Sequence, residues 1–119
     1  MTKRSFGSYL RTLREKRRAD DPSYSVRQVA ARIGVQPSFL SKVERGIEAP
    51  PSEPRIRALA ADLGEDPDVL LALAGKVSSD LQEVIRHRPQ LFAALIRDLK
   101  NLPDEAVEAT ARRVRDGEW

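Results

Sequence analysis

Residues 25–46 constrain the fold more than any other part of the chain, because two helical patterns follow each other across a very short break. Apolar residues recur at helical spacing over residues 26–33, behind Ser25, which is a good N-cap residue. Gly34 follows directly, where helices commonly end in a left-handed residue. Pro37 restarts a helix, since proline at the first helical position loses no useful hydrogen-bond donor. The pattern predicts two short helices joined by a tight turn.

The second of these helices has two different sides. Leu40 and Val43 form its inner side, while small and polar residues lie away from it: Gln36, Ser38, Ser41 and Lys42. A helix of this length with such outer residues fits the major groove of DNA. The two-helix segment is therefore a candidate nucleic-acid-binding motif.

Length and composition limit the class of protein. A chain of 119 residues allows one compact domain with a smaller appendage. No segment approaches the roughly 20 apolar residues that cross a bilayer, and the start of the chain lacks the apolar centre of a secretion signal. No cysteine is present, which excludes disulfides and thiolate metal sites. We expect a soluble cytoplasmic protein.

Charge is divided unevenly along the chain. Residues 1–51 carry eleven Lys and Arg against five Asp and Glu, a balance of +6, whereas residues 52–119 carry ten against thirteen, a balance of −3. Such a division is expected where one half neutralises phosphates and the other binds something else. The alternative is that the charges only cover solvated helices.

Helical patterns extend over the rest of the chain. They predict helices over 5–18, over 52–63 before Gly64, and over 67–74, followed by three short helices after Ser78 or Ser79, Pro89 and Pro103. No strand pattern is present, so the predicted fold class is all-α. We expect a five-helix DNA-binding domain over 1–75 and a C-terminal helical region over 76–119, whose helices are too small to fold alone.

The sequence offers no catalytic or metal site. His87 is the only histidine, and a catalytic zinc needs about three protein ligands. The six glycines are scattered and form no phosphate-binding loop, and His87 has no plausible partners for a catalytic triad. We therefore expect no enzyme activity, no metal and no cofactor.

Several segments together resemble the Xre/Cro helix-turn-helix family, which contains the lambdoid phage repressors. They are LRTLRE (10–15), the S-x-x-x-V-A-x-x-x-G-V pattern (25–35), LSKVERG (40–46) and ALAADLG (58–64). The resemblance covers residues 5–75 and implies a lambda-repressor-like domain that regulates transcription. One departure is the ADDPSY segment (19–24), which is about five residues longer than the usual turn and falls at a surface loop, where added length costs little.

The resemblance also implies which residues contact DNA bases. Carried over by position, they are Gln36, Pro37, Ser38, Phe39 and Lys42. Lys42 can donate to guanine, and Gln36 can pair with adenine or with phosphate. Pro37 has no polar group, so one polar contact made by relatives is missing here. Phe39 either contacts a thymine methyl or packs under the neighbouring loop.

Phosphate contacts and one structural ion pair complete the implied interface. The candidate phosphate contacts are Ser25, Arg27, Ser41, Arg45 and Arg55; for each arginine the alternative is a solvated surface charge. We expect the Ser41 hydroxyl to contact phosphate or water rather than a base. The family commonly pairs the positions of Arg14 and Glu44, so we expect a structural ion pair that fixes the recognition helix.

Specificity in such proteins generally comes from a twofold dimer on an inverted repeat. We therefore expect a homodimeric repressor, with an activator as an alternative. The candidate dimer or partner surface is Leu81, Ile85, Phe92, Leu95, Ile96, Leu99 and Trp119. Two other roles remain open for these side chains: they complete the core of the monomer, or they bind a toxin, which would make the protein an antitoxin. The tail, with LPDEAV and RDGEW, also weakly resembles repressors associated with ImmA/IrrE-type metallopeptidases, which implies a peptidase partner.

Overall fold

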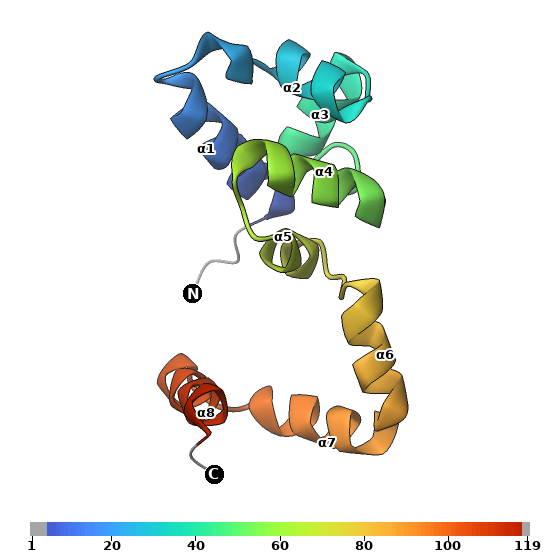
Figure 1. Cartoon of the computed structure of the whole chain (residues 1–119), viewed down its shortest axis with the longest axis vertical. Coiled ribbons are helices and arrows are strands. Elements are labelled where there is room, and N and C mark those ends of the chain that lie inside the picture. Colours follow the sequence, from blue (N-terminus) through green and yellow to red (C-terminus); the bar gives the residue numbers. More distant parts are fainter. Residues whose placement is uncertain (1–4, 118–119) are drawn as a thin grey trace. The chain divides into compact units, whose positions relative to one another are not determined.

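The computed structural model describes residues 5–117, and this part of the chain is helical (Figure 1). Its elements are α1 (Phe6–Arg18), a 3-10 turn η1 (Pro22–Tyr24), α2 (Val26–Ile33), α3 (Pro37–Glu44), α4 (Glu53–Leu63), α5 (Pro67–Leu73), α6 (Ser79–His87), α7 (Pro89–Leu99) and α8 (Asp104–Asp116). The predicted all-α fold class is confirmed. Within the described residues, no helix is long and apolar enough to cross a membrane.

The chain divides into two compact units, Met1–Ser78 and Ser79–Trp119. The first contains α1 to α5 and the second contains α6 to α8. The assignment of residues 1–75 to DNA binding and of residues 76–119 to dimerisation stays a prediction.

The helix ends follow local capping chemistry. The Ser25 hydroxyl accepts a hydrogen bond from the backbone N–H of Gln28 (3.2 Å), and the Asp66 carboxylate accepts one from the N–H of Asp68 (2.8 Å). Gly34 ends α2 with φ at 76°, a backbone conformation in which a Cβ is unfavourable. Ser52 stands at the N-cap of α4 as predicted, but its side chain makes no capping hydrogen bond.

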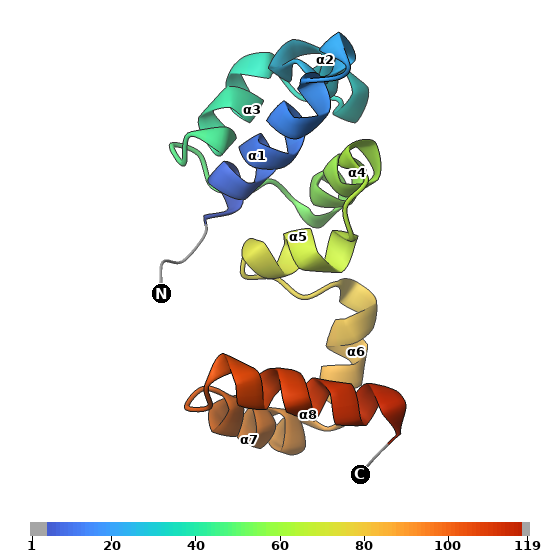
Figure 2. The same ribbon diagram turned by 90° about the vertical axis from the view of Figure 1, so that its left-hand side faces the viewer.

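Helices α1 to α5 share one apolar core. Figures 1 and 2 show α2 and α3 side by side, with α1 and α4 packed against this pair. The buried apolar residues are Phe6, Leu10, Val29, Ala30, Ile33, Leu40, Val43, Ile56, Leu59, Ala60, Leu63, Leu70 and Leu71. This core holds α3 from its inner side and leaves its other side to solvent.

A glycine allows α1 to approach the end of α3 closely. Gly7 is buried, and a Cβ at this position would lie 2.8 Å from the carbonyl oxygen of Glu44 and closer still to that of Val43. Real Cβ atoms essentially never make contacts this short. The position of α3 on α1 therefore requires glycine at residue 7.

The ADDPSY segment (19–24) is held to the helices of the first unit by hydrogen bonds. Asp21 caps η1, accepting a hydrogen bond from the Ser23 N–H (2.9 Å), which lowers the pKa of its carboxyl group. Arg14 donates to the Tyr24 carbonyl (3.1 Å) and Arg32 to the Ser23 carbonyl (2.7 Å). These bonds give the segment a defined path.

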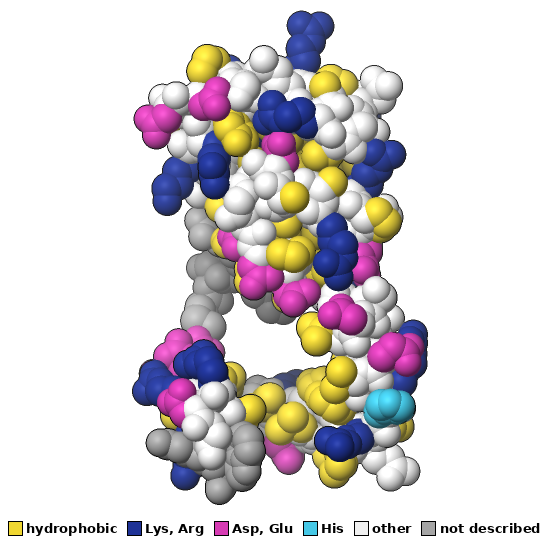
Figure 3. Space-filling model, in the orientation of Figure 1, with side chains coloured by type: hydrophobic (Ala, Val, Ile, Leu, Met, Phe, Trp, Pro, Cys, Tyr) yellow, Lys and Arg dark blue, Asp and Glu magenta, His cyan; other side chains and the backbone are white. Residues whose placement is uncertain are grey.

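The second unit has no buried residue over residues 79–117. Helices α6 and α7 are in contact, and Figure 3 shows apolar side chains open to view over α7. The large apolar side chains exposed in this unit are Leu81, Val84, Leu91, Leu95, Ile96, Leu102 and Val114. Such a set of helices covers little of its own apolar surface.

Candidate nucleic-acid interface

The outer side of α3 combines exposed side chains that can form hydrogen bonds with a firmly packed inner side. Leu40 and Val43 are each only 2% exposed, which anchors the helix on the core. Four of the predicted base-contacting residues are exposed: Gln36, Pro37, Ser38 and Lys42. The polar groups that could reach base edges thus lie on a rigid, solvent-facing surface.

Phe39 differs from the other predicted base contacts. Its side chain is half-buried and packs against the core cluster. Ser41 is also half-buried. Contact of Phe39 with a thymine methyl group stays a prediction.

The two predicted phosphate contacts at the beginning of α2 are Ser25 and Arg27, and their side chains differ in their surroundings. The Ser25 hydroxyl donates to Oε1 of Gln28 (3.0 Å) while it accepts from the Gln28 N–H. Arg27 follows in the first turn and is exposed. Of these two predicted phosphate contacts, Arg27 has the side chain that is available without breaking a bond of the described chain.

The two remaining arginines predicted to contact phosphate are exposed but differ in their surroundings. Nε of Arg45 donates a long hydrogen bond to the Ser41 carbonyl (3.4 Å), and its guanidinium makes no other hydrogen bond with the described residues. In contrast, Nη1 of Arg55 donates to the carbonyls of Ile33 and Gly34 (2.7 Å to the latter), at the end of α2. Arg55 therefore has a structural role that the sequence did not indicate.

Arg14 and Glu44 form a buried ion pair between α1 and the end of α3. Nε of Arg14 lies 2.6 Å from Oε2 of Glu44, Nη2 lies 2.9 Å from Oε1, and each side chain is 4% exposed. The hydrogen bonds to Glu44 raise the pKa of Arg14, with a smaller contribution from the nearby Glu15 carboxylate. This bidentate geometry fixes the last turn of α3, which carries Lys42.

A second bidentate pair was not anticipated from the sequence. Nε and Nη2 of Arg32 donate to the two carboxylate oxygens of Asp62, at 2.6 and 3.0 Å, which joins α2 to α4 and raises the pKa of Arg32. The Arg32 guanidinium also lies 5.0 Å from the centre of the Tyr24 ring. The two partners are 30 residues apart, so no local pattern marked them.

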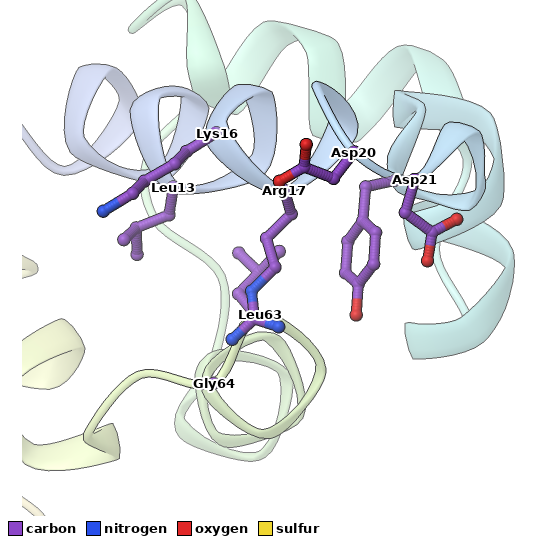
Figure 4. A pocket seen from close by; sticks show the side chains of 8 residues that line it. Leu13, Lys16, Arg17, Asp20, Asp21, Leu63 and Gly64 are labelled. Atoms are coloured by element: carbon purple, nitrogen blue, oxygen red, sulfur yellow. The ribbon is translucent and has the colours of Figure 1, made fainter.

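One hollow of the first unit lies away from the outer side of α3. Its volume is about 500 Å³, and Figure 4 shows it between the end of α1, the following turn and the end of α4. Both acidic and basic side chains line it, including Lys16, Arg17, Asp20 and Asp21. Arg17 reaches across it toward Gly64. The hollow contains none of the predicted DNA contacts.

Two further predictions from the sequence concern metal binding and the C-terminal Trp119. Among the described residues, no group of three or more His, Cys, Asp or Glu side chains could hold a metal ion. Trp119, predicted at the dimer or partner surface, lies outside the described residues.

The arrangement of α2 and α3 defines a helix-turn-helix protein. The family model of the helix-turn-helix domain matches residues 5–73, more than half of the chain, so the chain belongs to this family. Comparison with curated proteins and with solved structures gave no match. Family membership supports a DNA-binding regulator.

Proposed function

We propose that the protein is a homodimeric transcriptional repressor of the Xre/Cro type that acts in the cytoplasm, with α3 inserted in the major groove of an inverted-repeat operator. The observation that carries this proposal is the two-sided structure of α3. Its inner residues are buried, while Gln36, Ser38 and Lys42 present hydrogen-bonding groups to solvent.

The phosphate contacts in this proposal surround the same helix. Arg27 at the beginning of α2 and Arg45 after α3 are exposed, and residues 1–51 carry a balance of +6. Cations in these places would neutralise phosphates and orient the domain without reading sequence.

The C-terminal helices provide the dimer contacts in the proposal. Leu81, Leu95 and Ile96 are between 42% and 58% exposed, which leaves apolar area for a second copy to cover. The resemblance of the tail to peptidase-associated repressors adds a metallopeptidase as the proposed partner that relieves repression.

Selection of operators from random duplex DNA tests the proposal, with Lys42→Ala in parallel. We expect enrichment of an inverted repeat with half-sites roughly 34 Å apart. Lys42→Ala should weaken binding to that repeat by about 1–3 kcal/mol, because it removes a donor to a base edge. Lys100→Ala, which removes another exposed lysine, from the second unit, is the matched control.

The comparison of duplexes separates base contact from phosphate contact. Equal weakening of Lys42→Ala on selected and random duplexes would assign Lys42 to phosphate. Enrichment of no sequence by the wild-type chain would contradict the proposed operator binding.

A further inference from the structure

Helix α8 carries most of its charges in two separate blocks. Its first half contains Asp104, Glu105 and Glu108, and its second half contains Arg112, Arg113 and Arg115, all exposed. Asp116, at the end of the basic half, lies on the side of the helix opposite Val107 and Val114. None of the six residues in the two blocks forms an ion pair with another described residue. The helix therefore presents an acidic half and a basic half that are both available to a partner.

An apolar stripe runs along the same helix. Val107 and Val114 are two turns apart, so they lie on one face, and Val114 is 60% exposed. Thr110 lies between them, and its hydroxyl donates to the Ala106 carbonyl (2.8 Å), which satisfies its polar group within the helix. This stripe is only partly covered in the described chain.

The apolar stripe has two long edges, and different charged residues lie along each of them. Asp104 and Arg115 are 11 residues apart, about three helical turns, so they lie on the same edge at opposite ends. Arg113 lies on the other edge. This placement distinguishes between the two ways in which a second copy of α8 could pack on the stripe.

In a twofold antiparallel pair, residues on one edge meet the same edge of the partner in reverse order. Asp104 of each chain then faces Arg115 of the other, and the acidic half of each helix lies along the basic half of its partner. In a parallel pair, opposite edges meet, and Arg115 would face Arg113 of the second chain. Like charges would then oppose association.

From this pattern we propose that α8 pairs antiparallel with α8 of a second copy, with Asp104 and Arg115 forming two reciprocal contacts. The inference rests on the proposed homodimer and adds a helix and an orientation to it. The exposed apolar residues of the unit and the charge complementarity of α8 point to the same occupant, a second copy of this chain.

Charge reversal in the full chain tests the pairing, with the dimer dissociation constant measured by sedimentation equilibrium. Asp104→Arg alone and Arg115→Asp alone should each weaken the dimer about tenfold, because two attractive contacts become repulsive. A mixture of these two single variants should form a heterodimer of near wild-type strength, since each basic site then meets an acidic one. The double variant D104R/R115D should likewise recover the dimer.

The double variant also separates pairing from an effect within one helix. Acidic residues at the start of a helix and basic residues at its end stabilise it through its dipole. The double variant reverses that arrangement. Its dimer would therefore stay weak if the helix dipole alone caused the effects of the single variants. Circular dichroism of each variant gives its helix content.

Two substitutions at apolar positions test the same surface if a charge-reversal variant does not fold. Val114→Asn should weaken the dimer, whereas Ala109→Asn, on the opposite side of α8, should leave it unchanged. A wild-type chain that is monomeric at about 100 μM would overturn both the homodimer and this pairing. A dimer whose strength is unaffected by the single reversals, or not recovered in the mixture, would overturn the α8 pairing and leave the homodimer standing.

Discussion

At the scale of single residues, Gly7 determines how closely α3 approaches α1. We predict that Gly7→Ala destabilises the first unit by about 1–3 kcal/mol, because the added methyl group meets backbone carbonyls that cannot rotate away. Urea unfolding followed by circular dichroism measures the change. Thr12→Ala, on the exposed side of α1, should change stability by less than about 0.5 kcal/mol. Equal stability of Gly7→Ala and the wild type would contradict this prediction, because it would show that α1 and α3 can move apart without loss of stability.

The buried pair Arg14–Glu44 makes a second prediction at this scale. Glu44→Ala should cost about 3–5 kcal/mol, because it leaves the Arg14 guanidinium buried without its carboxylate. Asp62→Ala breaks a pair of the same geometry whose arginine is 37% exposed, and should cost about 1 kcal/mol or less. Thermal unfolding of both variants measures the difference. An unchanged melting temperature for Glu44→Ala, together with unchanged DNA affinity, would contradict the structural role of the pair.

At the scale of elements, Arg55 links the end of α2 to α4. Arg55→Ala should destabilise the first unit by about 1–3 kcal/mol, since the Ile33 and Gly34 carbonyls lose a charged donor. Arg27→Ala should leave stability nearly unchanged but lower the slope of log affinity against log salt by about one, because it removes one phosphate contact. Unfolding curves and salt titrations on both variants separate the roles. Equal stability of the two variants would mean that Arg55 does not cap α2.

Sequence patterns located the elements because their signals are local. Ser25, Gly34 and Asp66 act on backbone groups within a few residues, and the helices they delimit lie where they were predicted. The Arg32–Asp62 pair and the close approach at Gly7 depend on neighbours about 30 or more residues away. Only packing brings those partners together, so no spacing rule marks them.

The features of the candidate interface also fall into two groups: those that follow from the local sequence and those that depend on packing. Ser38 and Lys42 are exposed because the helical period places them opposite Leu40 and Val43, whereas Gln36 is exposed as the N-cap residue that precedes the helix. The capping role of Arg55 and the packing of Phe39 depend on where α4 and the core lie relative to α2 and α3. Sequence thus indicates which face is outer but not which of its side chains are already engaged.

At the scale of the whole molecule, the two units differ in what stabilises them. Among the described residues, every buried apolar side chain belongs to the first unit, and residues 79–117 contain no buried residue. Burial of apolar area is the main favourable term in folding. Three short helices without a core therefore need a further surface to cover their apolar side chains, and in the proposed homodimer a second copy would supply it.

This difference predicts how amide hydrogen exchange depends on protein concentration. Helices α6 to α8 should become about tenfold better protected when the concentration rises about a hundredfold, since exchange through a dissociated dimer follows the fraction of monomer. The core helices of the first unit, for example α4, should keep the same protection and serve as the internal control. Absence of protection over residues 79–117 at every concentration would instead favour the antitoxin alternative, in which the C-terminal half folds on a different protein. Strong protection that does not depend on concentration would mean that the unit folds within the monomer, which would contradict its proposed role in the dimer.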